Sequence, residues 1–215
     1  MYYKTQDQFG LTFDQVRKLY PSKSFPAGGQ IDTPEVSSYA PSTTPDYDPA
    51  THAVREVAPV DGVQQWEVYP LPAEEVAANQ AAARVAKWEA IKAERDRRKA
   101  MGVKVGAHWF HSDDPSRTQQ LGLARKADRL EASGGSTDTP FSGPGPGGIL
   151  AWKTIGGSFV PMTPALAQQI SGAIEALDLG VFAAAEAHRM AMESSAQPET
   201  YDITGGWPMS IEDEA

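Results

Sequence analysis

The chain has 215 residues, a length that suits one large domain or two small ones. Its 19 Lys and Arg residues stand against 28 Asp and Glu, and the net charge of −9 disfavours non-specific binding to nucleic acid or anionic lipid. The absence of cysteine excludes disulfides, thiolate zinc sites and cysteine nucleophiles, and it fits a reducing cytosol. No apolar run approaches the roughly 20 residues that span a bilayer, and no secretory signal is visible, so we expect no membrane association.

Prolines restrict residues 1–71 to short elements, because proline removes a backbone donor and restricts the residue before it. One short helical turn is expected at 16–20, with Thr12 or Asp14 as its cap. Residues 51–58 and 64–69 read as two strands of a β-hairpin that places Trp66 inward. Residues 59–62 form the turn, in which a glycine supplies the positive φ.

A long helix is predicted from residue 72 to 99, because the composition changes abruptly to alanine and charged residues. Acids in its first turn and bases in its last turn complement the helix dipole, and Gly102 is expected to terminate it. Its apolar stripe is narrow, and a helix of this kind usually bridges domains or lies on a partner. Residues 72–100 are therefore predicted to be a connecting helix.

A second unit is expected beyond Gly102. Residues 103–110 read as one strand, and Asp114 as N-cap with Pro115 at N1 opens a helix that runs to about 132. A Gly/Pro/Ser/Thr-rich loop follows at 133–148 and is expected to be mobile.

Two further elements complete this unit. Residues 152–155 and 158–161 flank a two-residue hairpin turn, Gly156-Gly157. Thr163 and Pro164 then start the longest helix, in which apolar residues recur every three or four positions. We therefore predict an α+β protein with three parts. Residues 1–71 are a β-rich, proline-rich region, 72–100 a connecting helix, and 101–215 a domain with a short antiparallel sheet packed on two helices.

Only one dense group of potential ligands occurs, around His108, His111 and Asp113. Strand alternation places the two histidines on opposite sides, and no fourth ligand beyond a carboxylate is evident. These three residues are weak metal candidates, and capping of the next helix explains the aspartate more simply. We expect no metal and no other cofactor.

No catalytic constellation is evident, so we expect no enzyme activity. His111, Ser112 and Asp113 have the residue types of a hydrolase triad, but three consecutive residues cannot align nucleophile, base and orienting group. The glycine-rich stretch at 143–148 lacks the Lys-Ser/Thr ending of a phosphate-binding loop.

The large aromatic residues divide into two expected groups, because aromatic side chains dominate both cores and interfaces. We expect partner contacts from Trp66, Tyr69 and Trp88. We expect a structural core from Trp109, Phe110, Trp152, Phe159 and Trp207.

Two sequence blocks carry a resemblance to a known family. The run from Gly102 to Arg117 (GVKVGAHWFHSDDPSR) resembles the opening of an uncharacterised C-terminal domain of bacteriophage tail proteins. The run from Trp152 to Thr163 (WKTIGGSFVPMT) resembles the core of that domain, and a long helix follows it. The resemblance covers about half the chain, residues 101–192. Upstream, the PDYDP run at 45–49, the PVDG turn, Trp66-Glu67-Val68 and the Ala/Glu-rich helix are similar in style to tail-fibre assembly proteins.

The resemblance implies a tail-fibre assembly chaperone, or a fibre-associated structural protein, without a chemical reaction. Its implied partner is a trimeric tail-fibre polypeptide, and its implied location is the bacterial host cytoplasm during assembly. Retention in the virion tail and homo-oligomerisation stay open. One alternative is a tail adaptor, with the 72–100 helix as spacer. Another is a receptor-binding tip with a metal or glycan site near His108 and His111.

Overall fold

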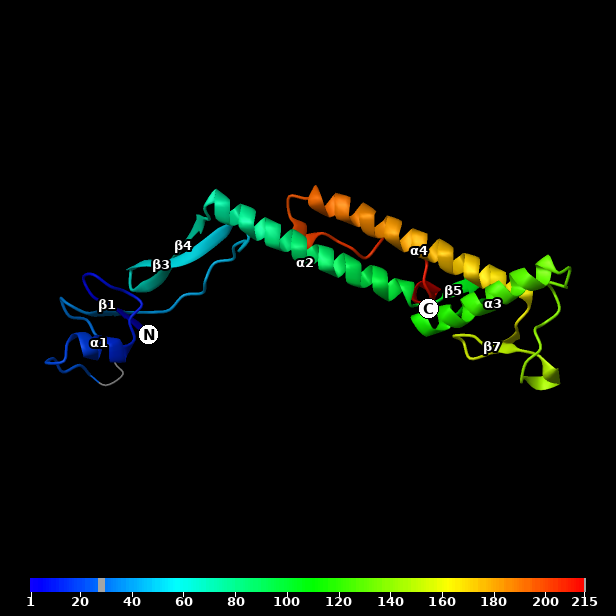
Figure 1. Cartoon of the computed structure of the whole chain (residues 1–215). Coiled ribbons are helices and arrows are strands. Elements are labelled where there is room, and N and C mark those ends of the chain that lie inside the picture. The colour runs from blue at the N-terminus through cyan, green and yellow to red at the C-terminus, as the bar shows by residue number, and fades with distance from the viewer. Residues whose placement is uncertain (27–29, 215) are drawn as a thin grey trace. The chain divides into compact units, whose positions relative to one another are not determined.

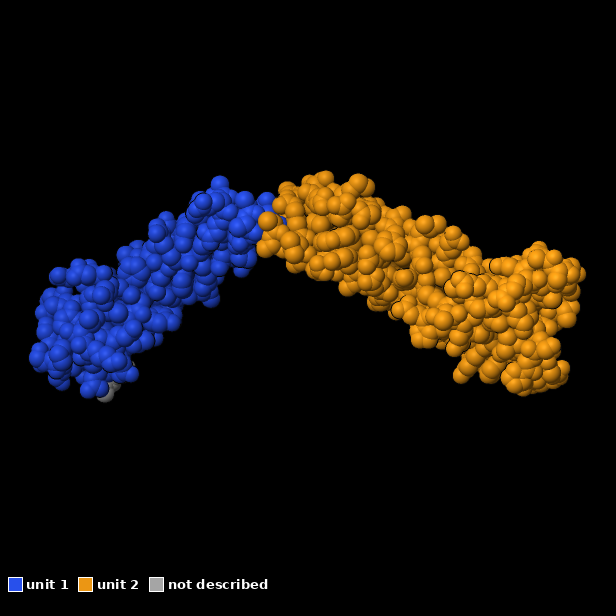
Figure 2. All heavy atoms as spheres, in the orientation of Figure 1, with its two compact units in different colours: residues 1–80 blue, residues 81–215 orange. Residues whose placement is uncertain are grey.

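The structure is a computed structural model that describes residues 1–26 and 30–214. The chain forms two compact units, residues 1–80 and 81–215 (Figure 2). The described residues fold into four α-helices and four two-stranded antiparallel sheets, which confirms the predicted α+β class (Figure 1). The units divide inside the long helix, whereas the predicted boundaries lay at its two ends. Among the described residues, no helix combines the length and the apolar character that crossing a membrane requires.

The first unit begins with a small lobe built from three short elements. Strand β1 (Tyr2–Lys4) pairs with β2 (Ser37–Tyr39), and helix α1 (Phe13–Leu19) packs beside them. The helix begins three residues before the predicted turn at 16–20, and Thr12, one of the two predicted caps, is its N-cap in a capping box with Gln15. The sheet was not predicted, because three-residue strands carry no readable alternation. The core of the lobe is formed by Tyr3, Leu11, Val16, Ile31 and Val36.

The predicted hairpin is confirmed in the same unit. Strand β3 (His52–Val60) pairs with β4 (Val63–Pro70), and the register shifts between Val57 and Val60. The turn is shorter than the predicted 59–62, because β3 extends to Val60 and only Asp61 and Gly62 connect the strands, with φ values of 51° and 72°. Two consecutive positive φ angles match the right-handed twist of the paired strands, which explains the Asp-Gly pair.

Helix α2 (Ala73–Lys99) confirms the predicted long helix, but Gly102 does not terminate it as expected. The helix ends three residues earlier, and the carbonyl of Lys99 accepts hydrogen bonds from Ser112 Oγ (2.7 Å) and Arg117 Nη2 (2.9 Å). Gly102 has a φ of 107°, and a Cβ there would lie 2.8 Å from the carbonyl oxygen of Phe110. The glycine is therefore required by close backbone approach.

The single strand predicted at 103–110 is wrong. The segment is a tight hairpin, β5 (Val103–Val105) and β6 (His108–Phe110), because Gly106 adopts a φ of 59° and reverses the chain. Helix α3 (Asp114–Ala132) ends as predicted, but its N-cap is Asp113, whose carboxylate accepts the amide of Ser116 at 3.0 Å. The predicted cap was one residue too late.

The next hairpin, β7 (Ala151–Lys153) and β8 (Phe159–Pro161), has a longer turn than predicted. The amide of Thr154 donates to Ser158 and that of Gly157 donates to Thr154, so three residues close the loop instead of two. Helix α4 (Pro164–Glu193) begins where predicted, with Thr163 as N-cap and Pro164 in the first turn.

The main core of the second unit lies between α3, α4 and the hairpins. Phe110 is fully buried in it and Trp152 packs against it, which confirms both predicted core positions. The prediction for Phe159 is wrong: it is 67% exposed, because strand alternation places Trp152 and Val160 on the covered face and Phe159 on the other. Trp109 is half-buried and lies outside this cluster. The cluster consists of Val103, Phe110, Ala127, Phe141, Met162, Ala167, Ile170, Leu177 and Val181.

A second cluster joins α2 to α4 through the segment that follows α4. Ile91, Ala185 and Met192 are buried in it. Trp207 packs against these three residues, as expected for a structural position, and so do Trp88, Tyr201 and Ile203. Figure 1 shows the segment after α4 running back along the two helices. The part of α2 from residue 81 onward is therefore integral to the second unit.

Candidate functional site

The β3–β4 hairpin presents an open strand edge. Along β4 the amide of Gln64 points outward, where it donates to Ala40 at 2.8 Å. Backbone groups of alternate strand residues point to the same side, so the amides and carbonyls of Trp66 and Val68 also point outward. These groups bond to nothing among residues 1–26 and 30–214. An unpaired edge of this kind is a template for an additional strand.

Exposed apolar side chains lie on both faces of this hairpin. Val68 is 37% exposed, and Val60 and Val63 beside the turn are 56% and 39% exposed. Trp66 is half-buried, and its indole Nε1 is buried without a hydrogen-bond partner in the described structure. Tyr69, on the opposite face, is half-buried below the guanidinium of Arg55. Two of the three predicted contact residues therefore lie on one hairpin.

Two partly buried hydrogen bonds of Tyr39 attach the hairpin to the lobe of the first unit. Tyr39 Oη donates to Glu56 Oε1 at 2.5 Å and accepts the amide of Gly10 at 2.6 Å. Burial, and then the hydrogen bond to Glu56, raise the pKa of Tyr39 to about 12. The phenol therefore stays protonated and keeps donating at neutral pH.

Trp88, the third predicted contact residue, lies in the second cluster instead. It packs against Ile91, Ala185 and Met192, with Lys92 and Arg189 over its ring. Trp88 therefore belongs to the second unit, whereas Trp66 and Tyr69 belong to the first. Its removal is expected to reduce stability, because part of its ring surface is covered by the chain itself.

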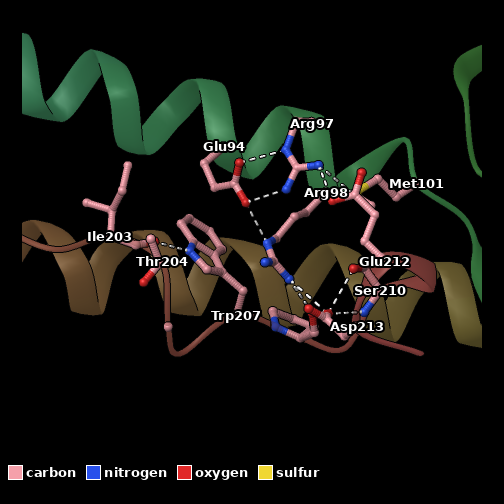
Figure 3. A network of polar contacts seen from close by, with 12 residues as sticks. Glu94, Arg97, Arg98, Met101, Ile203, Thr204, Trp207, Ser210, Glu212 and Asp213 are labelled. Carbon is pink, nitrogen blue, oxygen red and sulfur yellow. Dashed lines mark hydrogen bonds and ion pairs between the residues drawn. The ribbon is translucent and has the colours of Figure 1, made fainter. Parts of the chain in front are cut away.

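The basic end of α2 contacts an acidic segment near the end of the chain (Figure 3). Arg97 binds Glu94 and also donates to Glu212 at 2.8 Å. Arg98 donates to Glu94 at 2.7 Å, to the carbonyl of Pro208 at 3.1 Å and to Asp213 at 3.3 Å. We call this network, with the contacts of Glu214 described next, the acidic clasp.

The clasp extends to the β5–β6 hairpin. Glu214 accepts from Lys104 Nζ at 2.5 Å and from the indole of Trp109 at 2.9 Å. The amide of Ser210 and the Lys104 ammonium are the main causes that lower the carboxyl pKa values of Asp213 and Glu214 respectively. Trp109 thus binds the acidic segment, in place of its expected core role. Opposite charge runs at 95–99 and 212–214 were the sequence signal that could have predicted this pairing.

A polar junction connects the end of α2 to α3 and α4. The guanidinium of Arg117 donates to the carbonyls of Ser112 and Lys99 and to Asp178 Oδ2 (2.8 Å). Gln120 donates to the carbonyl of His111 at 2.8 Å. These bonds link the last residue of α2 to the start of α3 and to the middle of α4, while Gln120 Oε1 and Asp178 Oδ1 are buried without a partner in the described structure.

The three metal candidates do not form a metal site in the described residues, where no cluster of three such ligands occurs. His111 Nδ1 lies 3.9 Å from Asp113 Oδ2. The Asp113 carboxylate is engaged at the start of α3, where it accepts both the amide and the hydroxyl of Ser116. His108 stacks edge-on against Phe110.

The loop at 133–148, which was expected to be mobile, contributes Phe141 to the main core. Beyond it, exposed Phe159 lines an apolar hollow with Leu150, Ala151 and the Pro144–Pro146 turn. This surface is a smaller candidate for contact with another protein.

Comparison with known families places the chain in one of them. Residues 82–205 match the family described as a domain of unknown function (DUF4376), and because this match covers more than half of the chain, the chain belongs to that family. No curated protein and no solved structure matches the chain.

Proposed function

We propose that this DUF4376 protein is a bacteriophage tail-fibre assembly protein, which binds a tail-fibre polypeptide and catalyses no reaction. The two sequence blocks that resemble phage tail proteins, 102–117 and 152–163, both lie inside the DUF4376 match and motivate the choice of partner. The binding would take place in the host cytoplasm during assembly.

The observation that carries the binding role is the open edge of β4. It offers the outward backbone groups of Trp66 and Val68, which strand addition requires, and exposed valines lie on the same hairpin. Main-chain hydrogen bonds would give the affinity, and alternate side chains would give the specificity. This edge would therefore bind a segment of the fibre polypeptide in extended conformation.

The function is tested by co-expression with the fibre polypeptide encoded next to it, followed by size-exclusion chromatography with light scattering. A fibre that aggregates alone, but co-elutes as a soluble complex with this protein, is the expected result. A fibre that folds alone while this protein elutes separately would overturn the chaperone role. Presence at fixed copy number in purified virions would then assign an adaptor role.

The edge is tested separately by two matched proline variants. Val54 on β3 and Val68 on β4 lie directly opposite each other. They form a non-hydrogen-bonded pair, so the amide of each points away from the other strand. Val68→Pro removes an amide from the β4 edge and should abolish co-elution, whereas Val54→Pro removes one from the β3 edge and should preserve it. Retention of the fibre by both variants, with the parent complex intact, would exclude the β4 edge as the binding surface.

A further inference from the structure

The acidic clasp gathers three cationic side chains and one indole N–H from two elements of the second unit. Arg97 and Arg98 come from the last turn of α2, and Lys104 and Trp109 come from the β5–β6 hairpin. Each of Glu212, Asp213 and Glu214 binds at least one of these donors. In a chain of net charge −9, this group of donors is a local site for carboxylates.

The two arginines are positioned by contacts other than those with the three acids. Glu94 binds both arginines, through Arg97 Nε and Nη2 and through Arg98 Nε. Arg98 is only 10% exposed and is also held by the carbonyl of Pro208. The geometry of the two arginines would therefore persist if the three carboxylates left, and a preorganised site binds at lower entropic cost.

The acids themselves are held only at the surface. The side chains of Glu212, Asp213 and Glu214 are 62%, 43% and 31% exposed. Ion pairs of this exposure are weak and screened by salt, so the acidic segment can be displaced. The DUF4376 match ends at residue 205, so the acids lie outside the matched residues, whereas their donors lie inside.

From these observations we infer that the end of α2 and the β5–β6 hairpin form a docking site for an acidic peptide segment of another protein, and that the chain's own residues 210–214 occupy it in the free protein. The chain's segment acts as a resident competitor. It has a high effective concentration because it is tethered to the site. This inference does not rest on the proposed fibre partner.

The test uses the full chain with the resident acids neutralised by Glu212→Gln, Asp213→Asn and Glu214→Gln. The probe is a fluorescein-labelled peptide that copies residues 209–214 (MSIEDE), followed by fluorescence anisotropy at low and high salt. We expect the neutralised variant to bind this peptide about tenfold more tightly than the parent, because the tethered competitor is weakened. Binding should fall at high salt.

Two controls make the outcome decisive. A peptide with the three acids replaced by Gln, Asn and Gln should not bind. Adding Arg97→Ala and Lys104→Ala to the neutralised variant should remove binding, whereas adding Lys92→Ala, a cation of the same helix outside the clasp, should leave it unchanged. Equal affinity of parent and neutralised variant, or equal binding of the acidic and neutral peptides, would overturn the inference. Circular dichroism melting of every variant verifies that it is folded.

Discussion

Ile91→Ala tests whether α2 is an integral part of the second unit or a connecting helix. Ile91 is 0% exposed and packs from α2 against α4 and the segment that follows α4. Removing three buried carbons costs about 2.4 kcal/mol at roughly 0.8 kcal/mol per methylene. The residual cavity adds to this, so we expect a total loss of about 3 kcal/mol, within the range of roughly 2–5 kcal/mol for such truncations.

The assay is urea unfolding of the full chain, followed by tryptophan fluorescence, since Trp88 and Trp207 pack against the same cluster. The matched control is Val85→Ala, six residues earlier on the helix at a side chain that is 65% exposed. It should change the free energy of unfolding by less than about 0.5 kcal/mol. If Ile91→Ala were as mild as Val85→Ala, α2 would be a free connector and the second cluster would not stabilise the unit.

Two further predictions concern the second unit. Phe110→Ala should lower the free energy of unfolding by about 3–5 kcal/mol, because its ring is fully buried. Phe159→Ala should have a far smaller effect, because its side chain is 67% exposed. Equal decreases in melting temperature for the two variants would contradict the assignment of faces on β8. The clasp should make stability depend on pH, because folding lowers the carboxyl pKa values of Glu94, Asp213 and Glu214. These groups stabilise the folded chain fully above their unfolded-state pKa values near 4. The stabilisation is lost as the pH falls through their folded-state pKa values. Melting temperatures from pH 7 to pH 3 should therefore fall less steeply for the Glu212→Gln, Asp213→Asn, Glu214→Gln variant than for the parent, and identical slopes would show that the clasp carboxylates are not coupled to folding.

Local signals in the sequence determined most of the elements. Thr12 and Thr163 satisfy the first amides of their helices, and the Asp61-Gly62 pair supplies two positive φ angles, so these boundaries depend only on neighbouring residues. The 3.6-residue repeat of α4 likewise predicted its buried face, where Ile170 and Val181 are fully covered. Mistakes occurred where one residue changes the local geometry, as at Gly106, which turns an expected strand into a hairpin.

The sequence by itself therefore determined the helices, the hairpin at 52–70 and the acidic, cysteine-free character of the chain. Only the tertiary structure decided how distant segments are used. It placed Trp88 and Trp207 in one cluster, Trp109 on Glu214, and Phe159 at the surface. The physical reason is that periodicity and capping act over a few residues, whereas burial and ion pairing join positions more than 100 residues apart, as with Arg98 and Asp213.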